Sequence, residues 1–160
     1  MRKDDADHTG DAPPLGFERF RRRARDLVHD ADGLRELVRD AMARAEQRSP
    51  ALGSALHDLR TLIRMLGAWV RADYRELPRS SIILVIAAVL YFVVPFDLVP
   101  DFLFGIGLVD DVAVIGWVVR QIRRDLDAFR RWEVQLDAME TMIGRSRTSA
   151  GDPGPGNERE

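Results

Sequence analysis

The sequence predicts an all-α protein, in which an apolar helical hairpin with a Pro- and Asp-rich turn is flanked by amphipathic helices. Apolar residues recur at three- and four-residue spacing along most of the chain, which is the period of a helix with one buried face. Charge is also segregated, because residues 80–119 hold no Lys or Arg although the chain has 24. The length of 160 residues and the apolar content of 46% suit one domain, or one domain with a helical extension.

Four segments are expected from this pattern. They are a disordered lead (1–14), Arg-rich amphipathic helices (15–79), the apolar hairpin module with a C-terminal helix extension (80–143), and a disordered tail (144–160). The lead lacks the apolar stretch and cleavage site of a secretory signal. The net charge of −2 argues against a nucleic-acid-binding protein, and the absence of cysteine excludes thiolate zinc sites and thiol nucleophiles.

Three amphipathic helices are predicted before the hairpin. The first covers 15–30, the second follows with Asp32 as its N-cap, and the third covers 50–76 after Ser49 as its N-cap. Four arginines on the third helix lie on one line: Arg60, Arg64, Arg71 and Arg75. An anionic membrane surface would attract such a basic stripe. The alternative is a solvated face opposite a bundle core, with self-association through the apolar face of 52–70.

The run 82–94 has no polar side chain except the Tyr91 hydroxyl, so a helix there must be buried in protein or in lipid. It would be about 20 Å long, whereas a bilayer core needs about 30 Å. The second arm of the hairpin is predicted to begin at Asp110 as N-cap, with Asp111 in the first turn, and to continue to Ile143.

Arginines flank both ends of this hairpin, and its tip carries the acidic residues. The positive-inside rule then places both termini in the bacterial cytoplasm, with the hairpin in the cytoplasmic membrane and the lipid bilayer as partner. The alternative is a soluble cytoplasmic bundle with the hairpin as its core, acting through a protein partner or self-association. The short apolar run favours that alternative.

The segment YFVVPFDLVPDFLFGIGLVDD (91–111) resembles the signature of the YkvA-like bacterial family, known as domain of unknown function twelve-thirty-two. The residues that carry the resemblance are Pro95, Asp97, Leu98, Val99, Pro100, Asp101, Gly107, Asp110 and Asp111. The resemblance extends over about 80–119. It implies a small helical module, commonly a membrane protein, with no established reaction.

The four aspartates of this segment have two interpretations. Asp97, Asp101, Asp110 and Asp111 have no nearby Lys or Arg, so together they would suit a divalent cation such as Mg²⁺ or Ca²⁺. Alternatively, they cap helices and form turns. No catalytic motif or other cofactor site is found. The leading hypothesis is therefore a non-enzymatic membrane-associated protein, the alternatives being a soluble interaction module and a metal-binding Asp cluster.

Overall fold

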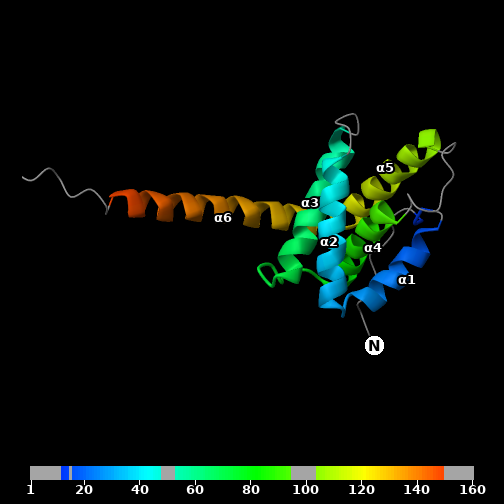
Figure 1. Ribbon diagram of the computed structural model, residues 1–160, viewed down its shortest axis with the longest axis horizontal. Helices are drawn as coiled ribbons and strands as arrows, with labels where there is room; N and C mark the ends of the chain where they lie inside the picture. The colour runs from blue at the N-terminus through cyan, green and yellow to red at the C-terminus, as the bar shows by residue number, and fades with distance from the viewer. Residues whose placement is uncertain (1–11, 15, 48–52, 95–103, 150–160) are drawn as a thin grey trace, which may run out of the picture. The chain divides into compact units, whose positions relative to one another are not determined.

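The computed structural model describes residues 12–14, 16–47, 53–94 and 104–149, and of 104–111 and 146–149 only the backbone. Every element in these ranges is a helix, which confirms the all-α prediction (Figure 1). The helices are α1 (Phe17–Leu27), α2 (Ala31–Glu46), α3 (Gly53–Val70), α4 (Arg79–Val93), α5 (Phe104–Gln121) and α6 (Arg123–Ser149). The chain forms two compact units, 1–126 and 127–160, which are described separately.

The first unit is built around α4. This helix contacts α1, α2, α3 and α5, and most of its apolar side chains are buried: Ile82, Val85, Ile86, Ala87, Ala88, Val89, Leu90 and Phe92. Ile83, Leu84 and Tyr91 on its remaining face are half-buried. A helix without a polar face has to be enclosed in this way, and each large buried side chain contributes about 1.5–3 kcal/mol. In this structure, protein side chains provide the enclosure.

Helix α1 packs on α4 through one face. Phe17, Phe20 and Ala24 are buried. The Phe20 ring meets the edge of Tyr91 on α4 at a centroid distance of 5.1 Å, and the Phe17 ring meets Trp117 on α5 at 5.4 Å. Such edge-on aromatic pairs add about 0.5–1.5 kcal/mol to the burial of their surface.

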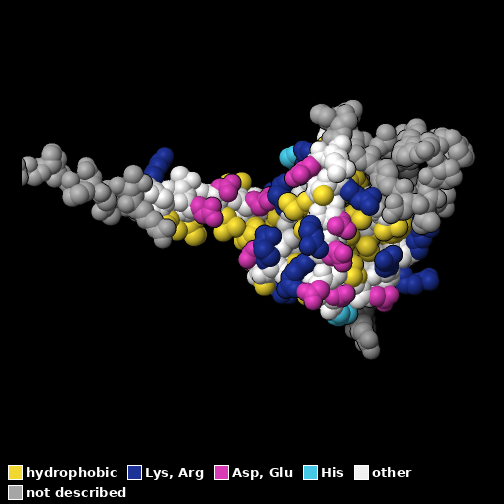
Figure 2. All heavy atoms as spheres, viewed as in Figure 1, with side chains coloured by type: hydrophobic (Ala, Val, Ile, Leu, Met, Phe, Trp, Pro, Cys, Tyr) yellow, Lys and Arg dark blue, Asp and Glu magenta, His cyan; other side chains and the backbone are white. Residues whose placement is uncertain are grey.

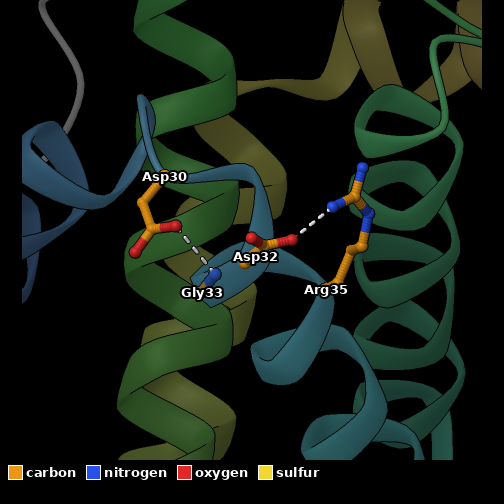
Figure 3. A network of polar contacts seen from close by, with 4 residues as sticks. All are labelled: Asp30, Asp32, Gly33 and Arg35. Atoms are coloured by element: carbon orange, nitrogen blue, oxygen red, sulfur yellow. Dashed lines mark hydrogen bonds and ion pairs between the residues drawn. The ribbon is translucent and has the colours of Figure 1, made fainter.

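Helix α2 is capped by Asp30, so the predicted N-cap, Asp32, is wrong. The Asp30 Oδ1 accepts a hydrogen bond from the backbone N–H of Gly33 at 3.0 Å (Figure 3). Asp32 lies in the first turn of the helix and pairs with Arg35 at 2.5 Å. Asp30 and Asp32 both stand just before the apolar stripe, so the sequence alone does not distinguish them as N-caps. Because the helix begins at Ala31, the backbone N–H of Gly33 lies within reach of the Asp30 side chain.

Helix α3 ends at Val70, whereas the sequence predicted a helix to 76. Ala72 adopts a left-handed conformation with a φ of 66°. The N–H of Ala72 bonds to Trp69 O at 3.1 Å, and the N–H of Asp73 bonds to Ala68 O at 3.0 Å. This is the Schellman arrangement, which satisfies the last carbonyls of a helix and turns the chain away.

The apolar face of α3 belongs to the core of the first unit, since Leu56, Leu59, Leu62, Ile63 and Leu66 are buried. The face of 52–70 was predicted as a surface for self-association. That prediction is wrong for most of the face, because α2, α4 and α5 contact this helix and cover its apolar side chains as far as Ala68, while Trp69 and Val70 are half-buried and residue 52 lies outside the described residues.

The second half of the chain departs from the prediction at three boundaries. Helix α5 begins at Phe104 instead of Asp110, and it ends at Gln121, where one continuous arm was predicted to reach Ile143. Backbone bonds from Ile122 N to Val118 O (3.0 Å) and from Leu126 N to Ile122 O (2.9 Å) lead into α6. Helix α6 continues to Ser149, so the part of the predicted tail before that residue is helical.

Candidate functional site

The Pro- and Asp-rich motif lies between α4 and α5. Pro95, Asp97, Pro100 and Asp101 fall outside the described residues, so the bend of the predicted hairpin is outside them too. Helices α4 and α5 contact each other on either side of it.

Gly107, Asp110 and Asp111 lie inside α5, which begins at Phe104. Asp110 is therefore not the N-cap that the sequence predicted, and Gly107 does not lie in the connecting segment. The glycines of this segment and the paired aspartates are typical signals of a helix start, but the backbone is already helical before them.

A cation site formed by the four aspartates remains a prediction, because none of their side chains is among those described. In the part of the chain whose side chains are described, no three His, Cys, Asp or Glu residues come close enough to hold a metal ion.

Two polar contacts hold the N-terminal end of α4. The buried Ser81 hydroxyl donates to Asp125 Oδ2 at 2.5 Å and so joins the start of α4 to the start of α6. The Arg79 Nη2 lies 2.9 Å from His29 Nε2, just before α2. A guanidinium has donors only, so His29 Nε2 is the acceptor.

The four arginines of the predicted basic stripe are exposed, but they do not lie on one helix. Arg60 and Arg64 belong to α3, whereas Arg71 and Arg75 follow its end. Arg71 Nε bonds to Asp73 Oδ2 at 2.8 Å, and the Arg75 guanidinium lies over the Trp69 ring at 5.1 Å. The left-handed turn at Ala72 breaks the line that a longer helix would have formed.

A second basic surface lies on α1, opposite the face that packs on α4 and α5. Arg19, Arg22, Arg23 and Arg25 are exposed, while Arg21 is half-buried and pairs with Glu18 at 2.8 Å. Figure 2 shows basic side chains on the face of the molecule where Figure 1 places α1. We call the four exposed residues, Arg19, Arg22, Arg23 and Arg25, the α1 arginine face.

Within the described ranges, none of the helices combines the length and the hydropathy that a membrane crossing requires.

Comparison with known proteins points to one family. A family model described as "protein of unknown function (DUF1232)" matches residues 81–117. The chain is also 34% identical over 80 residues to the uncharacterized membrane protein YkvA of Bacillus subtilis (strain 168), an alignment that covers 50% of this chain and 76% of the relative. The chain belongs to this family. No solved structure matches it.

The DUF1232 match spans almost all of α4 and continues into α5 as far as Trp117. Three contacts described above therefore begin on residues of the family module: the Ser81 bond to Asp125 and the contacts of Tyr91 and Trp117 with α1. Helix α1 lies outside the matched residues yet packs directly on them.

The arginines of α1 belong to the segment predicted as Arg-rich amphipathic helices, but the basic stripe predicted from the sequence lay on the third helix instead. The signal was present, since five of the seven residues from Arg19 to Arg25 are arginine. The structure adds that the apolar face of α1 is used by the core, so this helix presents its basic side outward.

Proposed function

We propose that the protein is a non-enzymatic helical module that binds the cytoplasmic surface of the bacterial membrane, with both termini in the cytoplasm. Its Bacillus subtilis relative carries the name of a membrane protein, which supports an association with lipid. The observation that carries the proposal is the α1 arginine face, which is exposed beside the family module.

The enclosure of α4 bears on how the protein would meet the bilayer. If the hairpin of 80–119 were inserted as a whole, α4 would have to leave its contacts with α1, α2 and α3. Burial of these apolar faces against one another stabilises the bundle, so their separation would be costly. The geometry favours a folded bundle on the membrane surface over an inserted hairpin.

The α1 arginine face would supply the attraction. An Arg near an anionic membrane surface contributes about 1 kcal/mol, and salt screens the interaction over a Debye length of about 8 Å at physiological ionic strength. Three arginines would then change the affinity for anionic vesicles by roughly a hundredfold.

The test is co-sedimentation of the full chain with vesicles of phosphatidylcholine, with or without phosphatidylglycerol. We expect binding to the anionic vesicles, weaker binding at high salt, and a large loss of affinity in the variant Arg19→Gln/Arg22→Gln/Arg23→Gln. The matched control removes three arginines of α2, Arg35→Gln/Arg39→Gln/Arg44→Gln, and should bind nearly as the wild type does. Equal binding by the α1 variant and the wild type would overturn the proposal.

Cell fractionation distinguishes the surface-bound bundle from the inserted hairpin. A surface-bound protein sediments with the membranes and is released by a carbonate wash, whereas an inserted hairpin resists it. Recovery in the soluble fraction before any wash would instead support the second candidate, a soluble interaction module. The enclosure of α4 by other helices is the observation that favours that candidate.

A further inference from the structure

The second unit leaves a row of large apolar side chains uncovered on α6. Every described side chain from 134 to 145 is exposed, and Leu136, Met139 and Ile143 have exposed fractions of 38%, 59% and 51%. Figure 2 shows hydrophobic side chains along one side of this helix. A single helix gains most of its stability by packing an apolar side against a partner, so these residues indicate a missing contact.

The spacing of these residues indicates the shape of the partner. With the half-buried Trp132, they form a series at intervals of four, three and four residues: Trp132, Leu136, Met139 and Ile143, which we call the α6 seam. Alternation of three and four is the heptad spacing of a coiled coil, in which Leu136 and Ile143 take position a, and Trp132 and Met139 take position d. A seam of this kind packs along another helix.

The charges beside the seam argue against a membrane as that partner. Glu133, Asp137 and Glu140 lie near it, and there is no Lys or Arg between Trp132 and Gly144. A helix that lies on an anionic membrane carries basic residues beside its apolar face, so an acidic face would be repelled.

We propose that the α6 seam pairs with the seam of a second copy of this chain, parallel and in register. In the heptad, Glu133 and Glu140 occupy position e, while Gln135 and Met142 occupy position g. An antiparallel pair places e against e, which would bring glutamates together. A parallel pair places e against g, so that Glu140 meets the neutral amide of Gln135 in the second copy.

Sedimentation equilibrium of the full chain tests the pairing. We expect a concentration-dependent dimer, because four layers make a short seam. The variant Leu136→Lys/Met139→Lys should weaken dimerisation by about tenfold or more, because it places charges in an apolar seam. The matched control is Val134→Lys, which changes an exposed apolar residue at position f and should dimerise as the wild type does. A monomeric wild type, or equal dimerisation of the seam variant, would overturn the proposal.

Disulfide cross-linking tests the direction of the two helices. The chain has no cysteine, so a single introduced thiol reports one position. In a parallel, in-register dimer, Met139→Cys should form a cross-linked dimer under mild oxidation, whereas Val134→Cys should not. Equal cross-linking at both positions would contradict a defined seam. Failure of Met139→Cys, combined with cross-linking between Leu136→Cys and Met139→Cys chains mixed together, would establish an antiparallel pair and overturn the parallel register.

Discussion

Ser81 donates its hydroxyl hydrogen to Asp125 Oδ2 at 2.5 Å across 44 residues of sequence. Ser81 is buried at the start of α4 and Asp125 is half-buried at the start of α6. The bond therefore fixes the two ends of the segment that contains the family module. A hydroxyl that is buried beside a carboxylate needs this partner, because a hydrogen bond lost inside a protein is not fully replaced by water.

Ser81→Ala should lower the free energy of unfolding by about 1–2 kcal/mol, because Asp125 then loses a donor in a partly dry site. Urea denaturation followed by circular dichroism would measure the change. Thr141→Ala is the control, since the Thr141 hydroxyl bonds to Asp137 O on the exposed part of α6 and its loss should change stability by about 0.5 kcal/mol or less. Equal stability of Ser81→Ala and the wild type would show that the bond does not stabilise the fold.

Ala72→Gly should stabilise the protein by about 1 kcal/mol. Ala72 has a φ of 66°, where the Cβ of an L-residue is strained and glycine is not. Thermal or urea unfolding would measure the gain. Ala68→Gly, inside the same helix, should instead destabilise by about 1 kcal/mol, because glycine is a poor helix former there. A loss of stability in Ala72→Gly would contradict the left-handed turn at this position.

Gly33→Ala should destabilise the protein although alanine favours helices. A Cβ at this position would come within 2.7 Å of Asp30 Oδ2 and 2.8 Å of Leu27 Cδ1, so the capping carboxylate would have to move. Loss of an N-cap costs about 1 kcal/mol, which offsets the usual gain from replacing a helical glycine.

A double-mutant cycle separates these two effects. Asp30→Ala alone should cost about 1 kcal/mol. In the Asp30→Ala background the clash with the carboxylate is gone and only the contact with the end of the Leu27 side chain is left, so Gly33→Ala should cost less there than in the wild type. Equal effects of Gly33→Ala in both backgrounds would mean that the cap and the glycine are independent.

The parts of the fold that could be predicted are those with a continuous apolar signal. The apolar run 82–94 coincides with most of helix α4, because it has no amphipathic break and prolines stand on both sides of it. Its enclosure also followed from sequence, although protein and lipid remained open as the surroundings. Only the contacts with α1, α2, α3 and α5 identify protein as the enclosure.

Boundaries set by backbone geometry could not be predicted. Ala72 ends α3 in a conformation that usually requires glycine, and nothing in the local residues signals it. The opposite error occurred at α5, where Asp110 and Asp111 gave a helix-start signal inside a helix that begins at Phe104. For the candidate site, the clusters of arginines on α1 and α3 could be seen in the sequence. The packing of the helices determines which of these clusters is exposed beside the family module, and the sequence does not show this packing.

The aspartate cluster predicts binding of a hard cation, and calorimetry with Mg²⁺, Ca²⁺ and Mn²⁺ tests it. If Asp97, Asp101, Asp110 and Asp111 share an ion, the wild type gives a binding heat that Asp101→Ala strongly reduces, because each carboxylate supplies charge and ligand oxygens. Asp73→Ala is the control, since Asp73 pairs with Arg71 far along the sequence from the motif. Absence of heat in the wild type would mean that these four aspartates do not form a cation site.

The basic stripe predicted from sequence should contribute less to membrane binding than the α1 arginine face. Arg71 is paired with Asp73 and Arg75 lies over the Trp69 ring, so two of these four arginines already have a partner. In the α1 arginine face, Arg19 lies over the Phe20 ring in the same way. Arg60 and Arg64 are exposed on α3, but Arg71 and Arg75 lie beyond the end of this helix at Val70. We expect the fourfold variant, with Arg60, Arg64, Arg71 and Arg75 each changed to Gln, to lose less affinity for phosphatidylglycerol vesicles than the threefold variant of α1. A larger loss in the fourfold variant would move the proposed membrane-binding surface from α1 to the end of α3.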